Sequence, residues 1–227
     1  MTNLKLNFKK IIQKLKAHYD IPAPPKTTDP FELILWENVA YLADDAKREK
    51  VFDELSKIVG LKPIDLLNAP LTDIDRATHL GGVSPQQNSS RLKECALIAM
   101  NDFGGDLKVA LALPVPKAIK ALRQFPGIGE PGAEKILLFT KTLPVLALDS
   151  NGLRVMLRLG FGEEKKSYTA SYKSVREAVV GQCDKDCESL IVAHQLLRQH
   201  GKTLCKTTKP RCEQCPVNSI CAYYLKH

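Results

Sequence analysis

Apolar residues recur at helical spacing along nearly the whole chain. Over residues 4–18, one stripe of the expected helix carries large apolar side chains and the opposite side is mostly lysine. The apolar stripe consists of Leu4, Phe8, Ile11, Ile12 and Leu15. Runs in which apolar and polar residues alternate, as in a half-buried strand, are absent or very short. The pattern therefore predicts an all-α protein.

Capping and turn residues divide this pattern into separate helices. A proline-rich break, IPAPPKTTDP, follows the first helix, and Asp29 is a suitable N-cap for a second helix that begins at Pro30. Further helices are expected at about 45–59, 63–68, 71–79, 88–103, 116–124, 131–141, 149–159, 168–180 and 186–199. The sequence contains neither a fixed-period repeat nor a long flexible linker.

Length and composition fit an ordinary globular protein. The 227 residues suffice for one large domain or two compact ones, and 44% of them are hydrophobic. This composition excludes collagen-like and extensively disordered chains. No apolar run approaches the roughly 20 residues that cross a bilayer, and the N-terminus lacks the pattern of a secretory signal. We therefore expect a cytoplasmic monomer without a membrane partner, associated with the nucleoid if the source is prokaryotic.

A glycine-containing loop lies between two of the expected helices. It reads Phe125-Pro126-Gly127-Ile128-Gly129, and Pro131 suits the first turn of the helix that follows. Two glycines at this spacing permit a tight hairpin whose backbone N–H groups point outward. Such donors at a helix N-terminus bind a phosphate without needing a charged side chain. The alternative is an ordinary turn between two helices with a glycine at the C-cap.

The last part of the chain concentrates cysteine. Four cysteines fall within 17 residues, at Cys205, Cys212, Cys215 and Cys221. In a reducing compartment such a group indicates a metal centre rather than disulfides. Zinc usually takes two separated Cys-x-x-Cys pairs, whereas here a single pair has longer arms. We therefore favour an iron–sulfur cluster over zinc, with unligated thiols as a third possibility.

The same segment is basic. Lys206, Lys209 and Arg211 lie between the first two of these cysteines, with no acidic residue among them. A metal-stapled loop with this charge is suited to contact a phosphate backbone. The alternative is a solvated loop that only keeps the metal centre soluble. The net charge of +8 for the whole chain is consistent with either interpretation.

These motifs in combination resemble the endonuclease III branch of the helix-hairpin-helix DNA glycosylases. The matching features are the spacing Cys-x6-Cys-x2-Cys-x5-Cys after LLRQHGKTLC, the hairpin FPGIGEPGAEKILLF, the segment ALDSNGLRV and the opening DPFELIL. The resemblance runs from about residue 29 to the end of the chain. It implies a two-domain, all-α fold that binds DNA in the cleft between its domains.

The resemblance also implies a domain division, a cofactor and an activity. A six-helix domain over 30–145 would end in the helix-hairpin-helix, and residues 1–29 and 146–227 would form a discontinuous domain around a [4Fe-4S] cluster. The activity would be base excision repair on double-stranded DNA. A damaged or mispaired nucleotide is flipped out of the duplex, and its glycosidic bond is cut.

Asp149 occupies the position of the family's catalytic carboxylate. Departure of a base leaves positive charge on the sugar, which a nearby carboxylate stabilises while it activates a nucleophile. Asp149 is also a good N-cap for the next helix, and the two roles are compatible.

The hairpin departs from the family pattern at a position that matters for the reaction. Bifunctional members carry a lysine two residues after the second hairpin glycine, and here that residue is Pro131. Proline has no side-chain amine and cannot form the Schiff base that strand cleavage requires. Lys135 lies on the same helical face, but about 6 Å farther along the axis. The sequence therefore predicts a monofunctional glycosylase with water as the nucleophile.

The second helix offers candidates for a base-binding pocket. Glu37 lies in a very apolar stretch and resembles the pocket glutamate of mismatch glycosylases in this superfamily, so we expect desolvation there and a catalytic role. Trp36 and Tyr41 are candidates for stacking on a flipped base. Alternatively, Trp36 belongs to the core and Glu37 lies on a narrow solvated stripe.

Two other functions remain open at this point. One is a bifunctional glycosylase/lyase that uses Lys135 or another amine, and the other is a non-catalytic protein that binds lesions. The sequence does not identify the excised base. Cys95 is expected in the core, and His200 is expected to pack or to cap a helix end.

Overall fold

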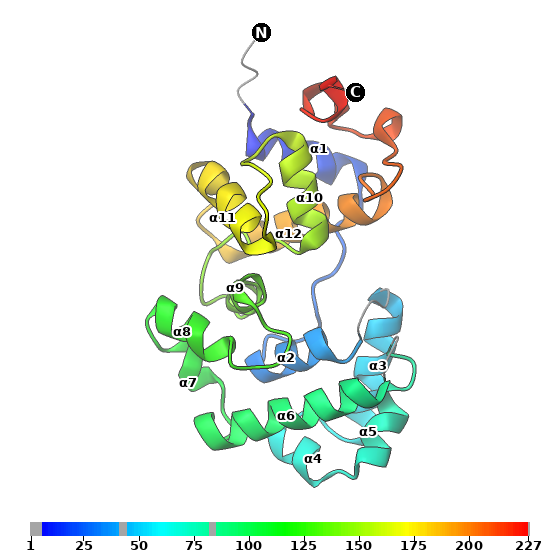
Figure 1. Ribbon diagram of the computed structural model, residues 1–227, viewed down its shortest axis with the longest axis vertical. Coiled ribbons are helices and arrows are strands. Elements are labelled where there is room, and N and C mark those ends of the chain that lie inside the picture. The colour runs from blue at the N-terminus through cyan, green and yellow to red at the C-terminus, as the bar shows by residue number, and fades with distance from the viewer. Residues whose placement is uncertain (1–5, 41–44, 82–84, 227) are drawn as a thin grey trace. The chain divides into compact units, whose positions relative to one another are not determined.

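A computed structural model describes residues 6–40, 45–81 and 85–226, with side chains at 85 and 86 left undescribed. Within these ranges the regular structure is entirely helical, so the predicted all-α class is confirmed (Figure 1). The proposed stacking residue Tyr41 lies outside the described ranges. The chain divides into two compact units, unit 1 over 1–24 and 141–227 and unit 2 over 25–140.

Unit 2 contains eight helices in the described residues. They are α2 (Pro30–Asn38), α3 (Asp45–Ile58), α4 (Pro63–Asn68), α5 (Leu71–Thr78), α6 (Pro85–Phe103), α7 (Lys108–Leu111), α8 (Val115–Leu122) and α9 (Glu130–Phe139). The long α6 packs against α2, α4 and α5 (Figure 1). Asp29 caps α2 as predicted, since its Oδ1 accepts from the N–H groups of Phe31 and Glu32 at 2.9 and 3.1 Å.

Helix α2 forms part of the core of unit 2. Its side chains Leu33, Ile34 and Leu35 are almost completely buried, as expected for a helix that is apolar on nearly every side. It packs against α6, α9 and α3. Because α9 is the second helix of the predicted hairpin, α2 and the hairpin are neighbours in one core.

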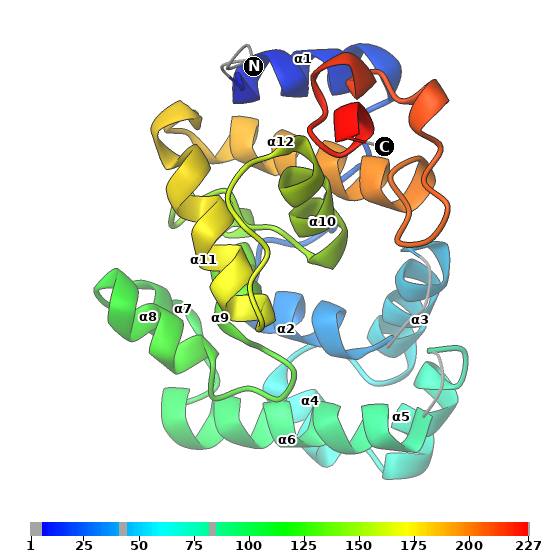
Figure 2. The ribbon, with the colours of Figure 1, turned by 45° about the horizontal axis from the view of Figure 1, so that its top comes forward.

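Unit 1 is built from four helices and several short turns in the described residues. They are α1 (Phe8–His18), α10 (Ser150–Leu159), α11 (Tyr168–Val179) and α12 (Cys187–Thr203), followed by 3-10 turns at Cys212–Gln214, Asn218–Ile220 and Tyr224–Lys226. Another 3-10 turn, Val180–Gln182, follows α11. Helix α12 packs against both α10 and α1 (Figure 2).

Close packing explains why α12 is longer than predicted. The helix continues to Thr203, through Gly201, instead of ending near 199. A Cβ at Gly201 would lie 2.7 Å from the backbone oxygen of Asn151, so only glycine permits this approach of α12 to α10. Helix α10 ends at Gly160, whose φ of 103° is the left-handed conformation typical of a glycine C-cap.

Other differences from the prediction concern helix ends. Helix α1 begins at Phe8 instead of residue 4, because the Asn7 side chain caps it by accepting from the Lys10 N–H. Helix α7 has only four residues, too few for a periodic apolar pattern, and was not predicted. No helix in the described ranges has both the length and the apolar character needed to cross a bilayer.

Candidate functional site

The predicted hairpin connects α8 to α9 in unit 2. Gly127 has a φ of 74°, which favours glycine, and Gly129 is the N-cap of α9. The Ile128 side chain is buried, and its N–H donates to the carbonyl of Phe125 at 3.1 Å. Ile128 therefore closes the turn with its own amide, while Gly127 and Gly129 are exposed.

A buried amide from α2 holds this loop in place. The Nδ2 of Asn38 donates to the carbonyls of Ile34 and Pro126, each at 3.0 Å. A Cβ at Gly127 would lie only 2.9 Å from the Asn38 Oδ1, so the loop and the amide fit closely. In the sequence, Asn38 stands out only as a polar residue in an apolar helix. Its polarity is explained by the hairpin carbonyl that it satisfies.

The neighbouring Glu37 also contacts the hairpin, through the second hairpin helix. Its Oε2 lies 2.5 Å from the Nζ of Lys135, and the two side chains are 22% and 16% exposed. The two side chains therefore form a largely buried ion pair. Glu37, for which the apolar sequence suggested desolvation, thus has a lysine partner.

Trp36 packs against α3. Its ring meets Phe52 edge to face with centroids 5.4 Å apart, and the guanidinium of Arg48 lies 5.9 Å from the ring centre. The side chain is only partly exposed. Part of the Trp36 ring is thus occupied by contacts with Phe52 and Arg48 of the same unit.

Asp149 begins α10 in unit 1 and has both of its oxygens engaged. Its Oδ1 accepts from the Gly152 N–H at 2.8 Å, which makes it the predicted N-cap. Its Oδ2 accepts from the Asn151 Nδ2 at 3.1 Å and lies 3.3 Å from the Nε of Arg198. The side chain is 19% exposed, so the carboxylate is accessible as well as oriented.

The surroundings of Asp149 keep it ionised. Burial alone would raise its pKa, but His194, the Gly152 N–H, the Asn151 amide and Arg198 outweigh that effect, so the pKa lies below its usual value of 3.8. At neutral pH the group is a carboxylate, the form that stabilises an adjacent cation.

A hydrogen-bonded chain connects Asp149 to the cysteine-rich segment. Arg154 donates through Nη2 to the Oδ1 of Asn151 at 2.9 Å and through Nε to the carbonyl of Cys205 at 2.9 Å. The same Nη2 lies 2.8 Å from the Gly201 carbonyl. Asn151 is therefore fixed on one side by Arg154 and on the other by Asp149. Arg154 was not among the residues predicted from sequence.

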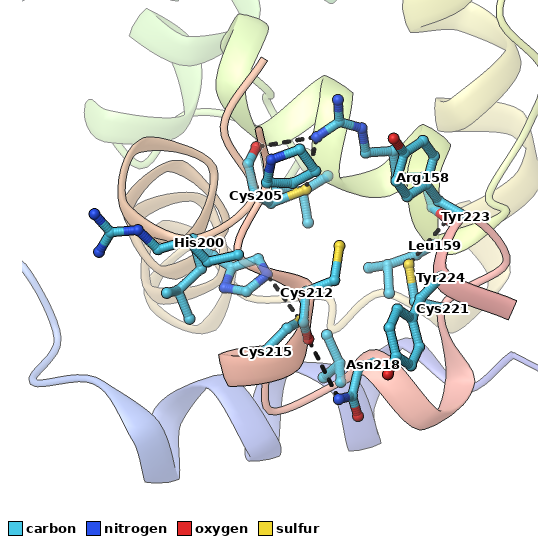
Figure 3. A pocket seen from close by; sticks show the side chains of 15 residues that line it. Arg158, Leu159, His200, Cys205, Cys212, Cys215, Asn218, Cys221, Tyr223 and Tyr224 are labelled. Atoms are coloured by element: carbon cyan, nitrogen blue, oxygen red, sulfur yellow. Dashed lines mark hydrogen bonds between the residues drawn. The ribbon is translucent and has the colours of Figure 1, made fainter. Parts of the chain in front are cut away.

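The four C-terminal cysteines line one pocket (Figure 3). Arg158 donates through Nη1 to the Cys205 Sγ at 3.4 Å, and its carbonyl accepts from the Cys221 Sγ at 3.2 Å. The Nε2 of His200 lies 3.4 Å from the Cys215 Sγ. These contacts are typical of the groups that orient metal-binding thiolates.

His200, which was predicted only to pack or to cap a helix end, makes specific polar contacts through both ring nitrogens. It is buried, and its Nδ1 lies 2.9 Å from the hydroxyl of Tyr19. Burial, with a contribution from His18, lowers the pKa of His200 to about 4, so the ring is neutral at pH 7. Burial also raises the pKa of Cys215 to about 11, so this thiol keeps its proton unless a metal displaces it.

Across the part of the chain that the structure describes, no three Cys, His, Asp or Glu side chains are placed to hold one metal ion. The cysteines instead surround a space. Four is the number of cysteine ligands that a four-iron cluster takes.

The basic residues of the same segment lie at its surface. Lys206, Lys209 and Arg211 are all exposed, as a DNA-contacting role requires. Arg158 holds the backbone beneath them by donating to the carbonyls of Lys206 at 2.7 Å and Thr207 at 3.0 Å. The segment is therefore anchored to α10 while its basic side chains remain accessible.

The other cysteines lie outside this pocket. Cys95 is completely buried in unit 2, which confirms the prediction, and burial raises its pKa to about 12. Cys187 is buried and Cys183 is half-buried, both in unit 1.

Comparisons with known proteins agree with these features. None of the protein-family models matches the chain. The thymine/uracil-DNA glycosylase of Methanothermobacter thermautotrophicus is 25% identical over 207 residues, which cover 88% of this chain and 85% of that protein. Endonuclease III of Sulfolobus acidocaldarius is 28% identical over 202 residues, with the same two coverages.

Solved structures extend the similarity to the fold. A thermostable thymine-DNA glycosylase matches with a TM-score of 0.75 at 21% identity, over 97% of each chain. A non-covalent endonuclease III–DNA complex matches with a TM-score of 0.75 at 21% identity, over 97% of this chain and 98% of that one. Over most of its length the chain is thus similar in sequence to thymine/uracil-DNA glycosylase and endonuclease III, and it shares the fold of the solved endonuclease III and thymine-DNA glycosylase structures.

Proposed function

We propose that the protein is a monofunctional DNA glycosylase of base excision repair. It binds double-stranded DNA with a damaged or mismatched base, accepts the flipped nucleotide and hydrolyses its N-glycosidic bond. The observation that carries this proposal is the state of Asp149, which is oriented by two hydrogen bonds, partly exposed and ionised at neutral pH. The names of its relatives, thymine/uracil-DNA glycosylase and endonuclease III, support the reaction class.

The reaction assigns Asp149 two tasks. As the bond between C1′ and the base nitrogen breaks, its electron pair leaves with the base and the sugar becomes an oxocarbenium-like cation. The carboxylate stabilises this charge. A water oxygen then bonds to C1′, with Asp149 accepting the proton that the water loses. The products are the free base and an abasic site in an intact strand.

The hairpin supports hydrolysis rather than strand cleavage. Pro131 stands where bifunctional relatives carry the amine, and it lies in the first turn of α9. Lys135, the nearest substitute on that helix, is paired with Glu37 at 2.5 Å. An ammonium group held by a carboxylate is a poor nucleophile, since Schiff-base formation needs the free amine.

Glu37 and its neighbours are the proposed base-binding residues. We assign Glu37 to hydrogen bonding or proton transfer at the flipped base, together with Trp36 and Tyr41 as stacking residues. The partial exposure of Glu37 is compatible with this role.

We further propose that Cys205, Cys212, Cys215 and Cys221 hold a [4Fe-4S] cluster. When bound, the cluster would cross-link the C-terminal segment between Cys205 and Cys221. The protein's own contribution is to orient the thiols, through Arg158 and His200.

Two surface segments are the proposed contacts to the DNA backbone. In unit 1, the exposed side chains of Lys206, Lys209 and Arg211 supply positive charge. In unit 2, the second contact is the hairpin of Gly127, Ile128 and Gly129, where the exposed Gly127 and Gly129 supply neutral N–H donors and Ile128 closes the turn.

A panel of lesion and mismatch duplexes tests this function, with base release and strand cleavage scored separately. We expect release of free base from at least one duplex, and strand cleavage only after alkali. Borohydride present during the reaction should trap no covalent protein–DNA adduct above background.

Two results would count against the proposal. A strong trapped adduct in the wild type that Lys135→Ala removes would assign a bifunctional enzyme. Tight lesion binding without base release from any duplex would assign a lesion-binding protein.

A further inference from the structure

Arg198 lies beside the proposed catalytic carboxylate. It is one helical turn beyond His194 on α12, and both residues act on Asp149 electrostatically. The Nε of Arg198 is 3.3 Å from the Asp149 Oδ2, and each side chain is 19% exposed. In the sequence this residue stands only as part of a basic stretch before the first cysteine of the pocket.

Asp149 does not depend on Arg198 for its orientation. The Gly152 N–H at 2.8 Å and the Asn151 Nδ2 at 3.1 Å come from the first turn of α10 and fix both carboxylate oxygens. The Arg198 contact, at 3.3 Å, is longer than either. The arginine could therefore move away without releasing the carboxylate.

The charge of Arg198 is a problem for the proposed chemistry if it stays in place. A guanidinium beside the carboxylate compensates the negative charge that must stabilise the sugar cation. The same guanidinium would repel that cation directly. Catalysis is thus favoured if another anion pairs with Arg198 in place of Asp149 when the substrate binds.

The substrate supplies such an anion next to the sugar. Every nucleotide within a strand is flanked by phosphodiesters, and the planar guanidinium matches the geometry of phosphate oxygens. We propose that Arg198 is a phosphate-binding residue of the catalytic site, which exchanges Asp149 for a phosphodiester of the flipped nucleotide. This inference rests on the proposed function. It adds a substrate contact and explains how Asp149 is freed for catalysis.

The test compares Arg198→Gln with the wild type on a duplex that carries a stable abasic-site analogue. Binding is titrated over a range of salt concentrations, and single-turnover excision is measured on a substrate from the lesion panel. Loss of one phosphate contact should reduce the magnitude of the salt slope by about 0.9 and weaken binding roughly tenfold at moderate salt. Single-turnover excision at subsaturating enzyme should fall in parallel with the affinity, because the lost contact is one that the substrate makes.

Two further variants support the interpretation. Arg198→Lys keeps the charge but loses the planar fork, so it should restore most of the salt slope and only part of the affinity. Arg176→Gln removes the same charge from the same unit, where the guanidinium lies 5.9 Å from the ring centre of Tyr172, and should leave the salt slope unchanged. Equal melting temperatures establish that the variants are folded.

Two results would overturn the inference. An unchanged salt slope in Arg198→Gln, with or without a loss of maximal rate, would make Arg198 a structural partner of Asp149. A slope reduced equally by Arg176→Gln would indicate only the general field of the unit. Failure of the proposed function is a separate result, because it would show as no base release by the wild type, whereas the abasic-duplex titration still reports on Arg198.

Discussion

Asp149 caps α10, and the features that suit it to this structural role also suit it to the chemical role that we propose. An N-cap needs a side-chain oxygen at the start of a helix, and the helix N-terminus in turn favours a negative charge. The surroundings of Asp149 hold its pKa below 3.8 despite its burial. The carboxylate is therefore available without a separate base to deprotonate it.

The lowered pKa predicts how excision depends on pH. A group with a depressed folded pKa contributes its stabilisation above the unfolded value of 3.8 and loses it as pH falls through the lower folded value. Asp149 should thus be fully ionised above about pH 5. We expect no loss of single-turnover excision between about pH 5 and 7 from titration of this residue.

A pH profile of Asp149→Glu checks this assignment. Wild type and variant should share any limb in that range, since another group would cause it. A wild-type limb near pH 5–6 that moves in Asp149→Glu would contradict an Asp149 that is ionised throughout the range.

Pro131 gives a gain-of-function prediction at the residue scale. The position lies in the first turn of α9, directly after the exposed hairpin, and lacks only an amine. Pro131→Lys should therefore produce a borohydride-trapped adduct on abasic-site DNA, while Pro131→Ala should not. Equal trapping by Pro131→Ala would show that some other amine is responsible.

At the scale of elements, α2 and the hairpin are joined by two side-chain contacts. Two adjacent residues of α2 contact it at different places, Asn38 at the Pro126 carbonyl in the loop and Glu37 at Lys135 in α9. The loop itself has a left-handed glycine, so its conformation depends on what surrounds it.

Asn38→Leu tests this coupling. Removing the amide leaves the Pro126 carbonyl without its bond from Asn38, which should cost about 1–3 kcal/mol of stability. DNA affinity should also fall, with an unchanged salt slope, because the phosphate contact proposed for the hairpin uses neutral N–H groups. Denaturant melts and salt titrations measure the two effects.

A matched control lies in the same unit. Thr78 is buried and donates through Oγ1 to the carbonyl of Ile74 at 2.9 Å, away from the hairpin. Thr78→Val should lose comparable stability but keep its DNA affinity. If both variants lose affinity equally, the effect of Asn38→Leu reflects general destabilisation.

Most helices were predictable from sequence because their signals are local. Asp29 and Pro30 mark the start of α2, and the apolar periods locate the longer helices within a few residues. The end of α12 was not predictable, because it depends on how closely Gly201 approaches the backbone of Asn151 in another helix. The four residues of α7 are too few to show a period.

At the scale of the whole chain, the motifs located candidate residues but not the side chains that support them. Asp149 and the four cysteines occupy fixed spacings, so a resemblance can identify them. Asn38, Arg154 and His200 act through contacts with residues farther along the chain, at Pro126, Cys205 and Cys215. The spacing of residues in a sequence motif does not reveal such contacts, which are seen only in the folded chain.

The cysteine pocket gives a prediction for the protein as purified. Anaerobic preparation should yield about four irons and four acid-labile sulfides per chain with broad visible absorption, since four cysteines line one pocket. Cys212→Ser should lose that absorption. Cys95→Ala, which alters a buried thiol of unit 2, should lose stability but keep the absorption. One zinc per chain without sulfide would refute the cluster.

The central claim is that the Asp149 carboxylate drives base release, and Asp149→Asn tests it most directly. Asparagine is an equally good N-cap and keeps the shape of the side chain, so α10 and DNA affinity should be preserved. Asp186→Asn, the same change at the N-cap of α12, serves as the control. In single-turnover base release from the preferred duplex, we predict at least a roughly hundredfold loss for Asp149→Asn and none for Asp186→Asn. Wild-type excision rates in Asp149→Asn, with DNA binding intact, would contradict this role of the carboxylate.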